Sequence, residues 1–387
     1  MNSRPRFATF SLLLLLTAYF CWTLWAADER TAAGPLAESL AANDSAGLPQ
    51  AVQPSQAAGP QSLANETGSL FLVVENGKRG YINRTGQMVI PPQYSFSDKF
   101  SEGLAAVLVG DKWGYIDNTG KMVIPPQYEE AYQFTEGLAA VDSRVKKILG
   151  TPRYRGYIDK TGKTVIPPQF VVEYDFAFGF SEGLAAVRKG YGGGFGYIDK
   201  TGKMVIPPRY AIVLGFSEGL AAVLVGDRLG GYKWGYIDKT GTMVISPEWY
   251  HLAFRFSEGL AAVQKFGDRF GYIDKTGQMT IPQQYSFADE FSEGLAAVKT
   301  GDKWGYIDKT GKMVIPQQYS LVFSFSEGLA AVEIGGKWGY IDKTGQMLIT
   351  PQWDRAYGFS GGLALVWVGD KWGYIDKTGK YVWTSTK

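Results

Sequence analysis

Acidic side chains recur at two fixed places along this 387-residue sequence. Carboxylates hydrolyse sugar polymers or bind Ca²⁺ when several of them converge on one point. The first series follows Gly-Tyr-Ile and contains Asn83, Asp117, Asp159, Asp199, Asp238, Asp274, Asp308, Asp342 and Asp376. The second series precedes Gly-Leu and contains Glu102, Glu136, Glu182, Glu218, Glu258, Glu293 and Glu327.

One acid of each kind per repeat does not converge on a point. The Asp series is therefore predicted to accept hydrogen bonds within its own turn, as Asp does in many turns. The Glu series is predicted to satisfy backbone donors or to pair with a Lys of a neighbouring turn. We accordingly predict no catalytic residue, no metal site and no cofactor.

Large flat side chains recur one residue before the Gly of each Gly-Tyr-Ile triplet: Arg79, Trp113, Arg155, Phe195, Trp234, Phe270, Trp304, Trp338 and Trp372. Such a series could form a ladder for sugars or extended peptides, or it could form a core. Strict periodicity through all units favours the core. The glycine indicates packing over bare backbone, either from the next unit or from the strand alongside. The residues expected to be structural are Trp113, Gly114, Tyr115, Asp117, Trp234, Trp304, Trp338 and Trp372.

The composition excludes several other chemistries. There are 39 Lys and Arg against 37 Asp and Glu, so no basic field indicates nucleic acid. The one Cys and the one His, Cys21 and His251, are too few for disulfides, Cys/His metal centres or a Cys–His nucleophile pair. The glycine-rich segment 188–197 lacks Gly-Lys-Ser/Thr and a following helix, so we interpret it as an enlarged hairpin turn.

The chain is a tandem repeat. The triplet Gly-Tyr-Ile begins at residues 80, 114, 156, 196, 235, 271, 305, 339 and 373, with spacings of 34, 42, 40, 39, 36, 34, 34 and 34. The motif FSEGLAAV, or a close variant, lies between successive triplets. Nine units therefore fill residues 69 to about 384.

Each unit is predicted to contain three strands. In the second unit these are LAAVLVG, KWGYID and KMVIP, which end at Gly110, Asp117 and Pro125. A Gly-Asp pair and an Asp-x-Thr-Gly turn connect them, because these residues tolerate turn geometry. The proline pair is expected to end the third strand, since proline cannot donate to a ladder.

The fold class is therefore all-β, with three-stranded β-meanders in tandem. A propeller blade usually has four strands, and no terminal strand of the sequence completes the first unit. We predict an open solenoid or superhelix of stacked meanders; the alternative is a closed, propeller-like ring.

The repeat KWGYIDKTGKMVIPPQY…FSEGLAAV resembles the bacterial WG-repeat (KWG-repeat) family over about residues 69–384. The resemblance implies an all-β repeat module, often exported, that binds proteins or surface polymers. It carries no catalytic residues that could be transferred. The units with Arg79, Arg155, Phe195 and Phe270 depart from the Trp of the motif, so they are expected to stack less tightly.

The N-terminus is predicted to be a targeting segment. Residues 1–27 combine Arg4 and Arg6 with an uncharged apolar run, which is typical of a cleaved signal peptide or of an uncleaved signal anchor. Both place the rest of the chain outside the cytoplasm: periplasmic, at the cell surface or secreted. Residues 28–68, rich in Ala, Ser, Gln and Pro, are predicted to form a disordered tether, and residues 69–387 the array.

The period breaks at the first hairpin turn of four successive units, and such insertions project from one edge. The insertions and their flanks carry Arg144, Lys146, Lys147, Arg153, Arg155, Arg188, Lys189, Tyr191, Arg228, Tyr232 and Lys233. This basic, Tyr-containing strip is our candidate contact surface for an acidic partner; loop-length drift is the alternative.

We predict an exported, non-enzymatic repeat scaffold that binds a protein or a cell-envelope polymer. The alternative is a polysaccharide-acting hydrolase that uses Asp and Glu of adjacent repeats. No nucleic acid is expected, and membrane contact only through the N-terminal segment if it is not cleaved. The sequence does not indicate an oligomeric state.

Overall fold

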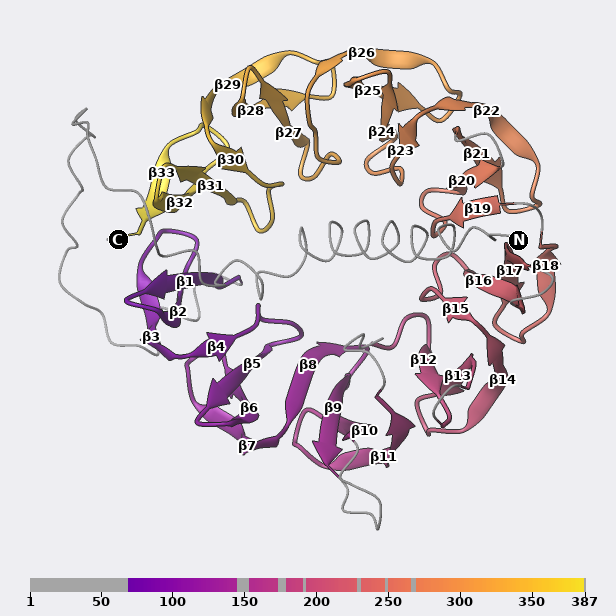
Figure 1. Cartoon of the computed structure of the whole chain (residues 1–387). Helices are drawn as coiled ribbons and strands as arrows, with labels where there is room; N and C mark the ends of the chain where they lie inside the picture. Colours follow the sequence, from indigo (N-terminus) through magenta and orange to yellow (C-terminus); the bar gives the residue numbers. More distant parts are fainter. Residues whose placement is uncertain are drawn as a thin grey trace, which may run out of the picture. The chain divides into compact units, whose positions relative to one another are not determined.

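A computed structural model describes residues 69–144, 153–172, 179–190, 193–227, 231–247, 250–265 and 269–385. These residues form nine small antiparallel sheets, and no helix is found among them. Figure 1 shows the sheets as blades arranged in a ring, with the last strand of each blade at the outer rim. The all-β prediction is confirmed. The segments 1–27 and 28–68 lie outside the described residues, and no helix in the described part of the chain is long and apolar enough to cross a bilayer.

Blades 1 to 9 follow chain order. Blades 1 to 3 contain β1 (Phe71–Glu75), β2 (Lys78–Ile82), β3 (Met88–Tyr94); β4 (Phe96–Ser97), β5 (Leu104–Val109), β6 (Lys112–Asp117), β7 (Met122–Tyr128); and β8 (Glu130–Thr135), β9 (Leu138–Arg144), β10 (Arg153–Asp159), β11 (Thr164–Val171). Blades 4 to 6 contain β12 (Leu184–Arg188), β13 (Phe195–Asp199), β14 (Met204–Tyr210); β15 (Ile212–Val213), β16 (Leu220–Asp227), β17 (Gly231–Asp238), β18 (Met243–Ile245); and β19 (Tyr250–Ala253), β20 (Leu260–Lys265), β21 (Phe270–Asp274), β22 (Met279–Tyr285). Blades 7 to 9 contain β23 (Phe287–Ala288), β24 (Leu295–Thr300), β25 (Lys303–Asp308), β26 (Met313–Tyr319); β27 (Leu329–Ile334), β28 (Lys337–Asp342), β29 (Met347–Trp353); and β30 (Arg355–Ala356), β31 (Ala364–Val368), β32 (Lys371–Ile375), β33 (Tyr381–Thr384).

The prediction that the proline pair ends the third strand is wrong, because the strand continues through its prolines in β3, β7, β11, β14, β22, β26 and β29. In blade 5, β18 ends at Ile245, before its proline. In blade 2, Tyr115 pairs with Ile124 and Trp113 pairs with Tyr128, which leaves extra residues on β7. These residues form a bulge at Pro125 and Pro126. The outermost strand pairs on one edge only, so a missing N–H costs little there, and proline protects the free edge from adding further strands.

The ring is closed, so the predicted open solenoid is wrong and the closed-ring alternative is confirmed. Blade 9 packs on blade 1: the Tyr374 hydroxyl donates to the Leu72 carbonyl at 2.9 Å, and its ring meets that of Phe71 edge-on at 5.4 Å. Most blades also have a fourth, inner strand in addition to the three predicted for each unit. In blade 2 this is β4, where Phe96 and Ser97 pair with Leu108 and Val107. Two residues are too few for a periodic pattern to reveal a strand.

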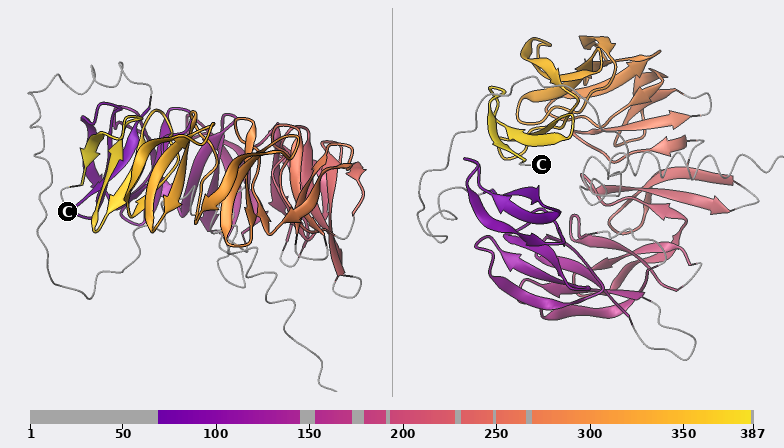
Figure 2. Two further views of the ribbon diagram at one scale, coloured as in Figure 1. Left: turned by 90° about the horizontal axis from the view of Figure 1, so that it is seen from above. Right: turned by 60° about the vertical axis from the view of Figure 1, so that its left-hand side comes forward.

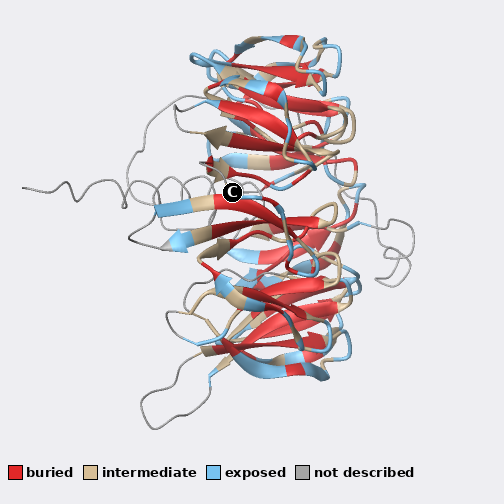
Figure 3. Ribbon diagram, turned by 90° about the vertical axis from the view of Figure 1, so that its right-hand side faces the viewer, coloured by how far each residue is buried: buried red, intermediate tan, exposed pale blue. Residues whose placement is uncertain are grey.

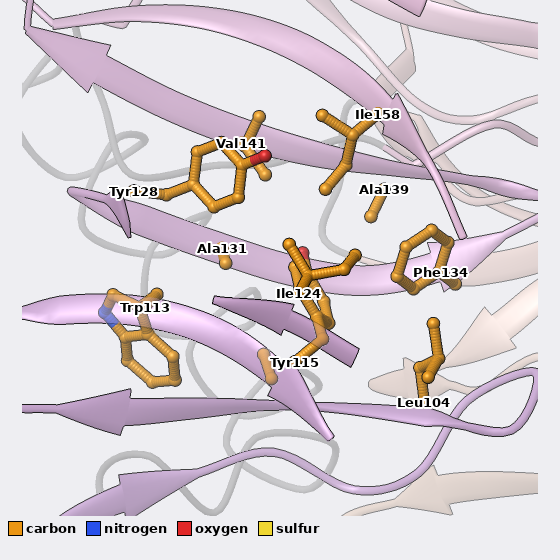
Figure 4. Close-up of a cluster of buried hydrophobic side chains, with 11 residues drawn as sticks. Leu104, Trp113, Tyr115, Ile124, Tyr128, Ala131, Phe134, Ala139, Val141 and Ile158 are labelled. Atoms are coloured by element: carbon orange, nitrogen blue, oxygen red, sulfur yellow. The ribbon is translucent and has the colours of Figure 1, made fainter. Parts of the chain in front are cut away.

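The blades stand side by side around the ring (Figure 2). The clusters of buried hydrophobic side chains join neighbouring blades. Figure 3 shows the buried positions along the strands and the exposed ones at the turns and edges. At the junction of blades 2 and 3, Trp113, Tyr115 and Ile124 of blade 2 pack against Ala131 and Phe134 of blade 3 (Figure 4). Burying one such aromatic side chain contributes about 2–3 kcal/mol, and every junction has one.

Candidate functional site

Each Gly-Tyr-Ile-Asp segment holds a turn at one face of the ring, which we call the turn face. The Asp117 Oδ1 accepts hydrogen bonds from the Thr119 amide at 2.9 Å, the Thr119 hydroxyl at 2.6 Å and the Lys121 amide at 3.0 Å. The same three bonds recur in the other units, including that of Asn83. The hydroxyl and amide bonds from Thr161 hold the pKa of Asp159 below its ordinary value. The side chains of this series therefore accept hydrogen bonds within their own turns.

The repeated glycine accommodates the bulge of the strand alongside, not a side chain of the next unit. A Cβ on Gly114 would lie 2.5 Å from the Ile124 carbonyl oxygen and 2.8 Å from the Pro126 nitrogen. The neighbouring tyrosine joins two blades: the Tyr115 hydroxyl donates to the Tyr132 carbonyl at 2.8 Å, and its ring meets Phe134 edge-on at 5.0 Å. The Trp side chains at positions 113, 234, 304 and 338 are 2–8% exposed. They are core residues, not a surface ladder.

The glutamates also join blades on the turn face. The Glu293 carboxylate accepts a hydrogen bond from the Gly328 amide of the next blade at 3.0 Å and pairs with Lys343 at 3.0 Å. Partial burial alone would raise the pKa of Glu293, but the bonds from Lys343 and Gly328 outweigh it and lower the pKa. Each of the seven glutamates has a φ of 51–54°, in the left-handed region that is costly for residues other than glycine.

The opposite face, which we call the hairpin face, carries the turn between the Leu-Ala-Ala-Val strand and the Gly-Tyr-Ile strand of each blade, such as the turn between β5 and β6. This is the first hairpin turn of the predicted three-stranded unit. Blades 7, 8, 9, 1 and 2 have turns of two residues: 301–302, 335–336, 369–370, 76–77 and 110–111. Blades 3 to 6 have longer connections, 145–152, 189–194, 228–230 and 266–269. Because the ring closes, the long connections form one uninterrupted arc and the short turns form the other.

In blade 3 the basic residues of the candidate strip are largely neutralised. Arg144 lies 3.5 Å from Glu129, and Arg153 lies 3.9 Å from Glu130. Arg155 is buried: its guanidinium donates to both oxygens of Asp142, at 2.8 and 2.9 Å, and lies over the Tyr132 ring at 4.8 Å. Burial opposes the charge of Arg155, yet the bonds to Asp142 raise its pKa. Arg155 therefore does not belong to the exposed strip.

Blade 5 presents an exposed tyrosine of the strip. Its strands β16 and β17 pair as far as Asp227 and Gly231, two pairs beyond the corresponding end of blade 2. Tyr232 stands on this extension opposite Gly226, and it is 40% exposed. Lys233 is next to it, and Arg188 of blade 4 lies over the Phe195 ring at 4.8 Å. Lys146, Lys147, Tyr191 and Arg228 lie outside the described residues.

Sequence reasoning missed a polar group at the inner edge of blades 6 to 8. The Ser324 hydroxyl donates to Asp289 at 2.7 Å, and Arg255 donates to Glu290 at 3.4 Å. Burial raises the pKa of both Asp289 and Glu290. The sequence signal is weak: these residues occupy the variable positions just before the FSEG motif. Among the described residues, no group of three or more His, Cys, Asp and Glu is arranged to hold a metal ion.

The comparisons with known proteins concern the repeat and the fold. The WG containing repeat matches eight segments: residues 80–113, 113–142, 156–192, 195–228, 234–267, 270–304, 304–338 and 338–372. No curated protein matches the chain. The crystal structure of a eukaryotic initiation factor is similar with a TM-score of 0.62 and 13% identity, over 82% of this chain and 95% of that chain. BamB from Moraxella catarrhalis gives a TM-score of 0.40 and 12% identity, over 74% of this chain and 97% of that chain. The likeness to the initiation factor shows a shared fold alone.

Proposed function

We propose that this chain, which belongs to the WG-containing repeat family, is a non-enzymatic, exported scaffold that binds a partner protein with the hairpin face of blades 3 to 6. One observation carries the proposal: four consecutive blades have enlarged hairpins on one face, whereas the other five have two-residue turns. Binding residues commonly lie on loops that a rigid scaffold positions. The apolar junctions between blades make the ring such a scaffold.

Tyr232 is the side chain that we expect to anchor the partner. Exposed Tyr and Arg dominate the energy of many protein interfaces, and Tyr loses little entropy when it is fixed. Its position on the β16–β17 extension holds it beyond the short turns, and Gly226 leaves the cross-strand position bare. A partner protein suits this surface better than a uniformly acidic polymer, because Arg144 and Arg153 already face Glu129 and Glu130.

The presence of Arg188, Lys189 and Lys233 near the hairpin ends of blades 4 and 5 supports an acidic contact there. The carboxylates of the repeats are engaged in turns and in bonds between blades, which supports a scaffold rather than a hydrolase. The N-terminal residues 1–27 support export.

The test uses the immobilised full-length chain and an extract of the cell envelope. We expect Y232A with K233E to reduce the amount of one defined retained protein by roughly tenfold, since an anchor residue contributes about 2 kcal/mol. The matched control, I334A with K337E, changes the same face in the short-turn arc and should retain the protein fully. Equal retention by both variants would overturn the proposal. Retention that survives protease treatment of the extract would point instead to an envelope polymer.

A further inference from the structure

Proline occupies a fixed position on the outer strands of the blades. In each blade one residue of the outer strand pairs with the Tyr of Gly-Tyr-Ile, and the next residue is proline in six blades: Pro91, Pro125, Pro167, Pro207, Pro282 and Pro316. In blades 5 and 8 this residue is Ser246 or Thr350, and Pro247 or Pro351 follows it. A proline on an outer strand protects the free edge of the blade from pairing with a further strand.

The outer strand of blade 9, β33, has no proline. Trp383 pairs with Tyr374, so Thr384 takes the position that proline has in blade 2. Ser385, the next residue, is not proline either. Thr384 pairs directly with Gly373, without the second register shift that β7 shows at its prolines. β33 therefore keeps every backbone N–H of its free edge.

The hydrogen bonds of β33 show which of its backbone groups face outwards. The carbonyl of Lys380 and the amide of Ser385 bond to β32 or to the residue after it, at 2.9 and 2.8 Å. Because successive strand residues direct their backbone groups to opposite edges, Tyr381 and Thr384 direct theirs away from β32. Both residues are exposed, Tyr381 by 39%. Within the part of the chain that the structure describes, no strand pairs with this edge.

We propose that β33 pairs antiparallel with β33 of a second copy of this chain, around a two-fold axis. Tyr381 of each copy then lies opposite Thr384 of the other, and their outward N–H and C=O groups bond to one another. An aromatic residue opposite a β-branched one is a favourable cross-strand pair. This interface is separate from the proposed partner surface on blades 3 to 6.

The second copy is the occupant that the strand itself favours. An identical antiparallel strand presents the same outward residues at the same spacing, so one contact satisfies both edges and closes as a dimer. Residues Tyr381–Thr384 carry no charge that would select a segment of another protein. The same register places Lys380 opposite Ser385 of the second copy, so no like charges meet. Because the contact is short, we expect a dimer that dissociates on dilution.

The first test supplies the missing proline. T384P removes an outward N–H and gives blade 9 the residue that six blades have at this position, so the blade should still fold. We expect sedimentation of the full-length chain to show a monomer–dimer equilibrium. T384P should weaken it by roughly tenfold, because two symmetry-related hydrogen bonds are lost.

The matched control is T350P, the same replacement at the same exposed position of blade 8, where Pro351 already protects the edge. It should dimerise as the parent chain does. A parent chain that remains monomeric at every concentration would overturn the proposal, and so would equal dimerisation of T384P and T350P.

A second test observes the edge directly by amide hydrogen exchange of the parent chain. Exchange at Tyr381 and Thr384 should slow as the protein concentration rises, whereas the inward Ser385 amide should be protected throughout. Exchange at Tyr381 and Thr384 that is independent of concentration in a dimerising chain would show that the dimer uses another surface. Protection that appears in a monomeric chain only after envelope extract is added would assign the edge to a segment of another protein, and the proposal would be wrong.

Discussion

The seven junctions from blades 2–3 to blades 8–9 differ from the two that flank blade 1. Each of the seven carries a Glu–Lys pair between blades: 102–160, 136–200, 182–239, 218–275, 258–309, 293–343 and 327–377. Blade 1 has no FSEG motif, and the turn that would receive its Glu contains Asn118 instead of Lys. At the junction of blades 9 and 1, Gly361 and Arg84 replace Glu and Lys. At this position of the turn, directly after the Asp or Asn, Lys therefore occurs only where the preceding blade has a Glu in its FSEG motif.

The junction of blades 9 and 1 nevertheless keeps the apolar contacts. Tyr374 still bonds and packs across it, and Gly86 lies against Val382 as Gly120 lies against Ile90. Exposed ion pairs contribute little to stability, about 0–1 kcal/mol each, whereas buried aromatic contacts contribute several times more. The difference between the junctions indicates that packing closes the ring and that the ionic pairs only supplement it.

The largest effect is expected from a change inside a blade, at the repeated glycine that blade 9 shares with the regular blades. A Cβ on Gly305 would lie 2.5 Å from the Ile315 carbonyl oxygen, and one on Gly373 would meet the Trp383 carbonyl. We expect G305A and G373A each to lower the free energy of unfolding by about 1–3 kcal/mol, measured by urea denaturation, because overpacking forces the outer strand to move.

The control for this prediction is G301A, in a two-residue turn with no atom within 4 Å of the added Cβ. G301A should therefore lose only the free energy that alanine costs at a positive φ, and the φ of Gly301 is 60°. Its loss should be smaller than that of G305A. A much smaller loss for G373A than for G305A would show that blade 9 is packed differently from the regular blades.

The repeat units were predictable because their signals are local. Residues such as Gly110 and Asp117 identify turns from a few neighbours, and the strands follow from the spacing. Closure of the ring was not predictable from local signals, because it depends on the angle between successive blades. Phe71 and Tyr374 come into contact only because these angles add up to a full turn over nine blades. Arg155 was placed on the surface because it lies beside an insertion, yet Asp142 is its cross-strand partner. Reading that register would have identified a buried ion pair.

The two tyrosine bonds offer a finer comparison of the junctions. The Tyr306 hydroxyl donates to the Phe323 carbonyl at 2.7 Å, and that of Tyr374 to the buried Leu72 at 2.9 Å. Y306F should cost about 0.5–1.5 kcal/mol, the usual net value of one hydrogen bond. Y374F should cost more, because its bond to Leu72 is buried, whereas the bond of Tyr306 is only part-buried, and a buried acceptor that loses its donor gains no water in exchange. Unfolding in urea measures both, and an equal or smaller loss for Y374F would contradict this ordering.

The smallest effect concerns the ionic pairs and their pH dependence. The pKa of Glu293 is lower in the folded chain than in the unfolded one, so its contribution is present above about pH 4.3 and is lost as the pH falls through the folded pKa. The Gly328 amide, which donates to this carboxylate, should then lose hydrogen-exchange protection between pH 5 and pH 3 after correction for intrinsic rates.

E293Q keeps an acceptor oxygen but does not titrate, so it should abolish this pH dependence. The junction of blades 9 and 1 has Gly361 and Arg84 at the positions of this pair, so the β1 amides should show no such pH dependence of hydrogen-exchange protection. A pH-dependent loss of protection in β1 equal to that of Gly328 would mean that acid opens the ring as a whole, and that the pairs are not local supplements.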